Sequence, residues 1–472
     1  MNNLKTKAAA GVTPKVLLTD TNRWSLAARL AIVLSEAGCD VSAVCPAHGH
    51  ALLKTRAVRQ TFPYSGLNPL KSLADAIEAV EPDVIVPSCD RGVEHLHELY
   101  AQSQSRGLGG SKLGGSKAAA LIERSLGSPA SYPVVSSRFE LLTLARENGV
   151  RVPRTSRVDT SEEIEPWQAL EPFPWVLKAD RTWGGGGVEI VHTADQLQQS
   201  FMQLARLFRP GRALKRIVVN RDPFWLRSWW NGSQHPISLQ SYIQGRPANC
   251  AVVCWEGRVL AAFAVEVVVS EGLTGPASVV RIVDNAEMMF AAERMASSLG
   301  LSGFFGLDFM IEEGSGAAYL IEMNPRTTPL CHLRLGKGRD MAGALWAQLA
   351  DQPVPETAPI TQNDMIAYFP QAWAGNRDLL NGCFPDIPQG EPDLVQELLQ
   401  PFPDRTLLFR LFSQLKRKPT QNYAVEIPKI LGHIQSKANE TRDCAPRETP
   451  GNAANITPLA TAPARSGRHD LS

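Results

Sequence analysis

Short apolar runs alternate with helical patterns over the first hundred residues. Residues 15–20, 40–45 and 83–87 have the length and apolar content of buried strands. Residues 25–37 and 70–80 have apolar positions at helical spacing. Strands that alternate with helices predict a doubly wound parallel sheet, so we expect an α/β unit in this part of the chain.

The pattern changes after residue 136. A helix over 136–148 is followed by short strands and helices and then, at 304–326, by two apolar strands joined by a Gly/Ser turn. These elements predict an α+β unit of antiparallel strand pairs with helices packed on one side. Helical patterns at 342–350, 392–399 and 406–416 predict a helical C-terminal extension. The other expected strands are 174–179, 188–192, 238–243, 248–255 and 258–268. The other expected helices are 161–170, 195–206, 285–299 and one that begins near Gly92.

The composition narrows the class of protein. The chain has 472 residues, a formal net charge of +1 and 8 cysteines without a C-x-x-C pair. The near-neutral charge argues against nucleic acid and anionic membranes as partners, and the scattered cysteines favour reduced thiols over a zinc site. No apolar run reaches about eighteen residues, and the first residues lack a secretory pattern. We therefore expect a soluble cytoplasmic protein.

Several local patterns predict no site. The glycine-rich segment 106–117 does not match a phosphate loop at any register, so a linker is expected there. The turn after the first strand lacks G-x-G-x-x-G, which argues against a dinucleotide site. His48 and His50 flank a glycine without a third ligand nearby. His332 is a candidate for contact with a substrate because it follows the 304–326 hairpin.

The 304–326 hairpin ends in a set of oxygen-bearing side chains. Glu322 and Asn324 are two residues apart, so in an extended strand their side chains point to the same face. Asp308, on the first strand, could face them across the hairpin. Two carboxylates and an amide oxygen, without His or Cys, form a set suited to Mg²⁺. The alternative is a solvated strand end, because Glu-x-Asn alone is a weak pattern.

A lysine and a glycine run form a second candidate site. Lys178 ends an apolar strand and is followed, after five residues, by Gly184, Gly185, Gly186 and Gly187. An ammonium group there can neutralise phosphate oxygens, and glycines let backbone N–H groups approach an anion closely. Such a loop can also close over a substrate and exclude water. The alternative is a tight hairpin turn beside a solvated lysine, but a turn rarely needs four glycines.

The order of these motifs resembles the ATP-grasp superfamily with its preceding pre-ATP-grasp domain. The likeness covers roughly residues 15–340 and is strongest in the K-x(5)-G-G-G-G loop and in D-x(13)-E-x-N-P-R. It implies a two-lobed ATP-grasp domain over 131–350, preceded by a pre-ATP-grasp domain over 15–130. A flexible N-terminus (1–14), the helical C-terminal extension (351–436) and a disordered tail (437–472) complete the predicted organisation.

The resemblance implies a role for each candidate residue. Arg138 and Lys178 would contact ATP phosphates under the glycine loop, and Arg326 would lie beside the γ-phosphate and the phosphorylated intermediate. Asp308, Glu322 and Asn324 would bind one or two Mg²⁺ ions, with Mn²⁺ as the alternative metal. The residues expected at the nucleotide base are Gln240, Ser241, Tyr242, Ile243 and Ile321. Many relatives carry glutamate at the position of Ser241, and relatives vary at that of Asp308.

The expected activity is that of an ATP- and Mg²⁺-dependent ligase. A carboxylate becomes an acyl phosphate, which an amine attacks to form a carbon–nitrogen bond, with release of ADP and phosphate. Lys178 and Arg326 are the expected catalytic residues, because they stabilise charge on the transferred group. The alternatives are bicarbonate activation through carboxyphosphate and an ATP-binding regulatory protein without turnover. The expected partners are the small-molecule carboxylate and amine, and a homodimer is a candidate assembly because dimers are common in the family.

Overall fold

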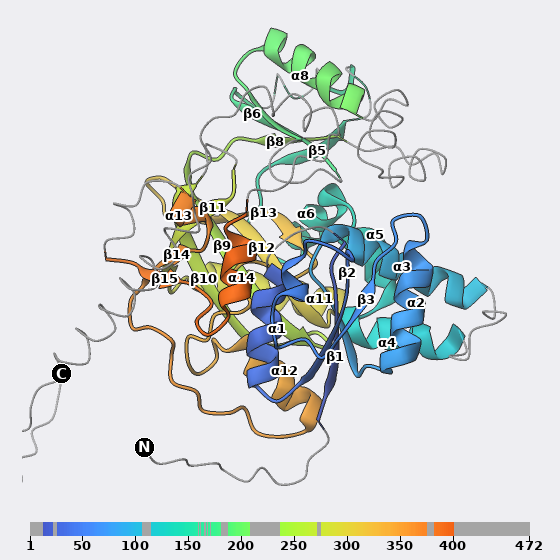
Figure 1. Ribbon diagram of the computed structural model, residues 1–472. Helices are drawn as coiled ribbons and strands as arrows, with labels where there is room; N and C mark the ends of the chain where they lie inside the picture. Colours follow the sequence, from blue (N-terminus) through green and yellow to red (C-terminus); the bar gives the residue numbers. More distant parts are fainter. Residues whose placement is uncertain are drawn as a thin grey trace, which may run out of the picture. The chain divides into compact units, whose positions relative to one another are not determined.

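The computed structural model describes residues 13–21, 26–105, 115–158, 160, 162–164, 167, 169, 171–180, 187–207, 237–270, 275–374 and 382–400. All of them lie in one of the two compact units of the chain, Met1–Lys416. The expected helix at 406–416, the expected tail and residues 1–12 lie outside the described residues. The described residues form three sheets (Figure 1). The domain boundaries drawn from the sequence stay predictions.

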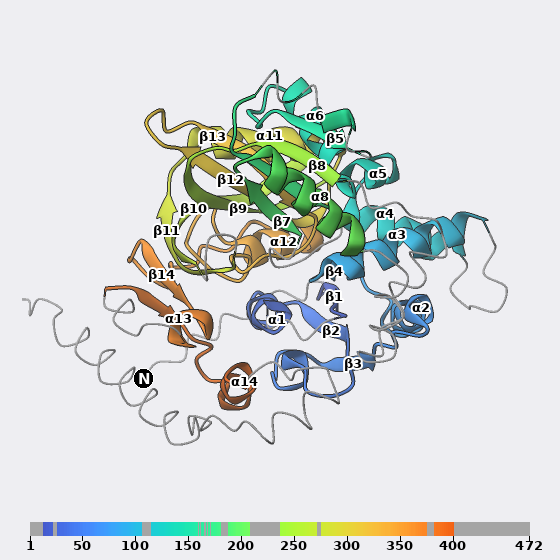
Figure 2. The same cartoon turned by 90° about the horizontal axis from the view of Figure 1, so that it is seen from above.

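The N-terminal sheet is parallel, as predicted. Its strands run in the order β3-β2-β1-β4. Helices α1 (Leu26–Glu36) and α2 (Pro69–Val80) lie on opposite faces of it, which confirms the doubly wound arrangement (Figure 2). The polar strand β3 was not predicted, because its short run lacks an apolar pattern. The strands are β1 (Lys15–Thr19), β2 (Asp40–Cys45), β3 (Gln60–Pro63) and β4 (Val84–Pro87), and the short helix η1 (Ala51–Leu53) follows β2.

A run of helices leads from this sheet to the rest of the unit. α3 and α4 pack into one apolar core with β1 and β4, through residues such as Leu96, Ile122 and Ile85. The N-terminal turn of α4 lies in the segment predicted to be a linker, of which residues 106–114 are outside the described ranges. The helices are α3 (Asp90–Ser105), α4 (Gly115–Leu126), η2 (Pro129–Ser131), α5 (Tyr132–Val135) and α6 (Arg138–Glu147).

The second sheet is small and antiparallel, in the order β5-β8-β6-β7. Trp175, Leu177 and Leu239 are fully buried in its core, where α8 covers one face. Side chains alternate along a strand, so Lys178 and Gln240 face the other side of this sheet. The elements are β5 (Thr155–Val158), η3 (Glu162–Ile164), β6 (Trp175–Ala179), β7 (Val188–Val191), α8 (Ala194–Leu207) and β8 (Ile237–Ser241).

The third sheet has seven strands, in the order β13-β12-β9-β10-β11-β14-β15. All neighbours are antiparallel except β14 and β15. The strands are β9 (Gly245–Trp255), β10 (Arg258–Ser270), β11 (Ala277–Val283), β12 (Gly303–Glu312), β13 (Ala318–Asn324), β14 (Met365–Tyr368) and β15 (Phe384–Asp386). The mixed α/β architecture predicted from the sequence is therefore confirmed.

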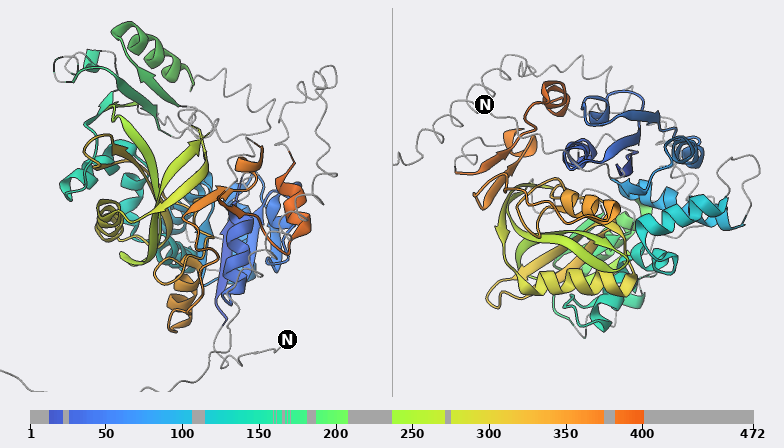
Figure 3. Two further views of the ribbon diagram at one scale, coloured as in Figure 1. Left: turned by 90° about the vertical axis from the view of Figure 1, so that its left-hand side faces the viewer. Right: turned by 90° about the horizontal axis from the view of Figure 1, so that it is seen from below.

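Helices cover both faces of this third sheet, so the prediction of helices on one side was wrong here. α11 (Ala286–Leu299) packs against one face, and α12 (Met341–Ala350) contacts β9, β10 and α1 on the other (Figure 3). The reason lies in β9, where consecutive apolar residues from Cys250 to Cys254 are all buried. A strand buried on both sides needs a covering layer on each.

The C-terminal extension contributes strands as well as helices. β14 and β15 add to the edge of the third sheet, and the described helices beyond residue 351 are α13 (Gln371–Ala374) and α14 (Pro392–Leu398). Arg29 of α1 forms a buried ion pair with Asp386 of β15, which ties the extension to the N-terminal sheet. Among the described helices none has the length and apolar character that a bilayer span requires.

Candidate active site

The hairpin β12–β13 brings the three predicted oxygen ligands together. Asp308 is directly opposite Glu322 in the strand register, and Gly306 is opposite Asn324. Asn324 Nδ2 donates a hydrogen bond of 3.0 Å to Asp308 Oδ2. A side chain at Gly306 would collide with Thr328, whose methyl carbon would lie 2.3 Å from its Cβ. Glycine there lets the segment after Arg326 pack onto the strand beneath the site.

The two carboxylates have opposite electrostatic surroundings. Burial and the neighbouring Glu322 raise the pKa of Asp308 to about 6, although Asn249 Nδ2 donates to its Oδ1 at 2.7 Å. Burial also opposes ionisation of Glu322, but the charges of Arg138 and Lys178 bring its pKa below the ordinary value. Both groups are therefore ionised at neutral pH, and together with the Asn324 amide they offer oxygen donors only.

This donor set fits a hard divalent cation that is shared with a phosphate ligand. Among the described residues no three His, Cys, Asp or Glu side chains converge as a complete metal cage. Two carboxylates and an amide leave several positions of an octahedral ion to water and phosphate oxygens, which is how proteins usually hold Mg²⁺. The role of Asp308, Glu322 and Asn324 as ligands stays a prediction.

Arg138 joins the small sheet to the hairpin. It is the first residue of α6, where Ser137 caps the helix by accepting a hydrogen bond from the Glu140 backbone N–H. Its Nη1 lies 3.0 Å from Asp180 Oδ1 and its Nη2 lies 2.7 Å from Glu322 Oε1. Burial opposes its charge, but Glu322 and Asp180 raise its pKa. Within the described part of the chain, the buried Nε has no hydrogen-bond partner.

Lys178 is the penultimate residue of β6 and is buried against the hairpin. Its Nζ donates a hydrogen bond of 3.4 Å to the backbone oxygen of Ile321, the residue before Glu322. Burial and the nearby charge of Arg138 lower the pKa of Lys178 to about 8, while Glu322 and Asp308 act in the opposite direction. The ammonium group is thus mostly charged at pH 7. Two cations and two anions share one buried space, which suits a polyanionic ligand.

The predicted glycine loop is described at one end only. Gly184, Gly185 and Gly186 lie outside the described residues, whereas Gly187 is buried. The Gly187 backbone oxygen accepts a hydrogen bond of 2.9 Å from Ala179, and Lys178 pairs with Val188 across the β6–β7 hairpin. The connection that contains the glycines therefore starts and ends beside Lys178.

The predicted linker strand is β8 with the turn that follows it. Gln240 is 1% exposed, and its Nε2 has no partner among the described residues. It lies opposite Val176 of β6, on the same side of the small sheet as Lys178. The Ser241 backbone N–H donates to the Arg154 oxygen at 3.0 Å, Ile243 is half-buried and Tyr242 is 37% exposed. A buried amide donor requires an acceptor, and the role of Gln240 at a nucleotide base stays a prediction.

Arg326 makes three contacts at the far end of β13. Its Nη2 lies 3.0 Å from Asn324 Oδ1, its Nη1 donates to the Thr327 backbone oxygen at 3.1 Å, and its Nε lies 2.9 Å from Asp90 Oδ2. Burial opposes its charge, but Asp90 raises its pKa. Asp90 is the first residue of α3, so Arg326 connects the hairpin to the N-terminal sheet.

Three residues of the site were not predicted from the sequence. Asp180 follows Lys178 by two positions and was the one that local sequence could have indicated. Asn249 contacts Asp308 from β9, and Asp90 contacts Arg326 from a position 236 residues away in the chain. No local pattern marks either of them. His332 contacts Asp386 through Nε2 at 2.9 Å and is buried, so the structure adds no substrate contact for it.

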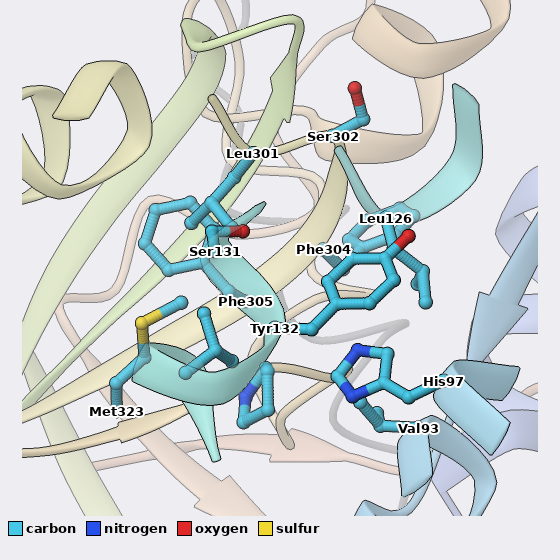
Figure 4. Close-up of a pocket in the computed structure, with 12 residues that line it drawn as sticks. Val93, His97, Leu126, Ser131, Tyr132, Leu301, Ser302, Phe304, Phe305 and Met323 are labelled. Atoms are coloured by element: carbon cyan, nitrogen blue, oxygen red, sulfur yellow. The ribbon is translucent and has the colours of Figure 1, made fainter. Parts of the chain in front are cut away.

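The opposite face of β13 is held by apolar contacts. Met323 and Pro325, which alternate with Glu322 and Asn324, line a small pocket together with Phe305, Tyr132 and His97 (Figure 4). The His97 and Tyr132 rings are stacked 3.9 Å apart, and burial lowers the pKa of His97 to about 4. The neutral imidazole packs as an apolar group, which fixes the strand that carries the oxygen ligands.

Comparisons with known proteins show what this chain is similar to. The family model described as "ATP-grasp domain" matches residues 226–329. The large chain of the arginine-specific carbamoyl phosphate synthase of Geobacillus stearothermophilus is 24% identical over 177 residues. That match spans 36% of this chain and 14% of the relative's length.

Solved structures show the same fold at low sequence identity. One is the biotin carboxylase domain of the Hydrogenobacter thermophilus 2-oxoglutarate carboxylase, in complex with MgADP, ADP and bicarbonate. It has a TM-score of 0.52 and 16% identity, over 73% of this chain and 71% of that chain. Another is the L-amino acid ligase of Bacillus licheniformis, with a TM-score of 0.51 and 14% identity, over 74% of this chain and 79% of that chain. Both likenesses concern the fold.

Proposed function

We propose that this protein is an ATP- and Mg²⁺-dependent ligase that joins a carboxylate to an amine. One observation carries the proposal. Arg138 and Lys178 lie beside a set of two carboxylates and an amide, and Arg326 extends from that set toward the N-terminal sheet. Cations on one side of an oxygen donor set, with an arginine leading away from it, suit phosphoryl transfer to a second substrate.

Different residues of the chain contact different parts of ATP in this proposal. Lys178 and Arg138 bind the phosphates, and both are held by contacts to the hairpin. The backbone of residues 240–243 would contact the base, and Ile321 would pack on it. Asp308, Glu322 and Asn324 would hold Mg²⁺, which would supply positive charge against the phosphates. Arg326 lies beside the transferred phosphoryl group and orients it toward the acceptor.

The proposed reaction balances in two steps. A carboxylate oxygen attacks the γ-phosphorus, the bond to the bridging oxygen of ADP breaks, and an acyl phosphate forms. The nitrogen lone pair of an amine then forms the C–N bond while the C–O bond to phosphate breaks. An ammonium substrate loses two protons, one of which leaves on hydrogen phosphate and the other in water. Acyl phosphates hydrolyse readily, so exclusion of water is required.

The experiment is an ADP-release assay with a panel of amino acids and small carboxylates, each tested with and without an amine. The expected result is ADP release that requires a carboxylate and Mg²⁺ and that accompanies amide formation. ADP release stimulated by bicarbonate alone would favour the carboxyphosphate alternative. Binding of ATP without cleavage under every condition would contradict the ligase and favour a regulatory nucleotide-binding protein.

A further inference from the structure

The junction between α3 and the end of β13 combines charges and free hydrogen-bonding groups. Asp90 begins α3 and is separated from the end of β4 by two residues, and Arg326 follows β13. The Thr327 N–H donates to the Pro87 oxygen at 3.2 Å, which holds the two strand ends together. We call the residues Ser88, Asp90, Arg326 and Thr327 the acceptor junction.

The Asp90 carboxylate is only partly used by the protein. Its Oδ2 accepts the hydrogen bond from Arg326 Nε at 2.9 Å, and no described residue donates one to Oδ1. The Asp90 side chain is 28% exposed and that of Arg326 is 20% exposed. Asp90 is the first residue of α3, and the N-terminal end of a helix favours a negatively charged side chain. One anionic oxygen at the junction is therefore open to a ligand.

A second observation also indicates a polar ligand. Ser88 and Thr327 are each 1% exposed, and neither of their buried hydroxyls has a hydrogen-bond partner within the described ranges. Ser88 lies two residues before Asp90, and Thr327 directly follows Arg326. Buried hydroxyls without partners are uncommon in proteins and are usually satisfied by something that binds. The groups beside the ion pair are thus short of polar partners.

We propose that Asp90 binds the ammonium group of the amine substrate through Oδ1, beside Arg326. This inference rests on the proposed ligase function. A carboxylate placed at Oδ1 would be repelled by Asp90, whereas an ammonium group there would donate a hydrogen bond to an oxygen of opposite charge. Arg326 faces the acyl phosphate and Asp90 faces the ammonium group. The two substrates therefore meet at the ion pair between Asp90 and Arg326. Asp90 would thus select amines and hold the nitrogen near the acyl carbon.

The test compares a charged and an uncharged nucleophile on the same acyl phosphate. Hydroxylamine is largely uncharged at neutral pH and traps an acyl phosphate as a hydroxamate, whose ferric complex is coloured. The primary amine used in the same assay is present mainly as its ammonium ion at neutral pH. In Asp90→Asn, which keeps an oxygen for Arg326 Nε, the ratio of amide to hydroxamate should fall at least about tenfold. Using the ratio cancels any change in phosphoryl transfer that affects both products.

Two further variants complete the design. Asp75→Asn removes a carboxylate of α2 that pairs on the surface with Lys71, and it should leave the ratio unchanged. Asp90→Glu keeps the charge but moves it by one methylene group. Asp90→Glu should raise the KM of the amine more than the KM of ATP. This variant also tests the inference if Asp90→Asn fails to fold. A role in positioning Arg326 alone would not separate these two constants.

The outcomes separate the two proposals. If Asp90→Asn lowers amide and hydroxamate equally, Asp90 serves Arg326 only, and the inference is overturned while the ligase proposal stands. If Asp90→Glu changes both KM values equally or neither, the inference is likewise overturned. If the wild-type protein forms neither hydroxamate nor ADP with any carboxylate of the panel, the ligase proposal fails and the inference with it.

Discussion

The two ends of the candidate site are built differently. At the nucleotide end, Arg138 lies between two carboxylates and Lys178 contacts the hairpin backbone, so each cation already has a partner in the protein. At the acceptor junction, one ion pair stands beside partly exposed side chains and hydroxyls without partners in the described residues. If the proposed function holds, the difference means that the nucleotide end would take one kind of ligand, while the acceptor junction would leave polar groups for a variable one.

The largest effect should come from Glu322 at the nucleotide end. Glu322→Gln removes one of the two carboxylates and should lower carboxylate-dependent ADP release at least about a thousandfold, which corresponds to about 4 kcal/mol. The variant should also lose Mg²⁺-dependent binding of ADP, measured by calorimetry. Glu313→Gln, on the exposed turn of the same hairpin, is the matched control and should change neither quantity. Wild-type turnover in Glu322→Gln would contradict the assignment.

The next effect tests whether the nucleotide end is an electrostatic unit. Arg138→Met leaves Asp180 and Glu322 without their shared partner, and a buried pair broken in this way costs about 3 kcal/mol in the free energy of unfolding. Arg151→Met is the control. Arg151 forms an ion pair of 2.6 Å with Glu287 in which both side chains are more than 40% exposed, at 43% and 48%, so its loss should cost about 0.5 kcal/mol. Urea unfolding measures both, and equal costs would show that Arg138 is not a buried link.

The local part of the site could be predicted from the sequence, and the long-range part could not. Glu322 and Asn324 share a face because a strand has a two-residue period, and Lys178 lies at the end of an apolar run. Asp90 and Asn249 reach the site through strand order and packing, which no short window of sequence contains. The roles of all these residues remain predictions.

The same limit applies to the fold. β12 and β13 are long apolar strands around a Gly/Ser turn, so their pattern is strong. β14 and β15 were not predicted, because four and three residues are too few to show a period. They become strands by pairing with β11 and with each other, which is a tertiary effect. The extension was therefore expected to be helical, although it also completes the third sheet.

A smaller effect concerns the buried ion pair between Arg29 and Asp386. Burial opposes ionisation of Asp386, but Arg29 and His332 hold its pKa at about 2, below the ordinary 3.8. A lowered carboxyl pKa contributes stability above about pH 4, and this contribution is lost as the pH falls from about 4 to about 2. At pH 5, Asp386→Asn should be less stable than wild type by about 2 kcal/mol, and the gap should close toward pH 2.

Urea unfolding at several pH values measures the gap between Asp386→Asn and wild type. Asp75→Asn serves as the control, since Asp75 pairs with Lys71 at the surface and should give a difference below about 0.5 kcal/mol at every pH. A gap for Asp386→Asn that stays constant from pH 5 to pH 2 would show that the charge of Asp386, paired with Arg29, does not contribute to stability.

The smallest effect should come from Asn249, which supports the nucleotide end from β9. Its Nδ2 donates a hydrogen bond of 2.7 Å to Asp308 Oδ1, while Asn324 donates one to the other oxygen of the same carboxylate. Asn249→Ala removes one of two orienting contacts, so Mg²⁺-dependent binding of ADP should weaken about tenfold. Binding of ADP without Mg²⁺ should change much less, because the cations that hold the phosphates are untouched. Equal losses with and without Mg²⁺ would mean that Asn249 shapes the whole pocket, and the contrast between the two ends would then rest on Glu322 and Arg138 alone.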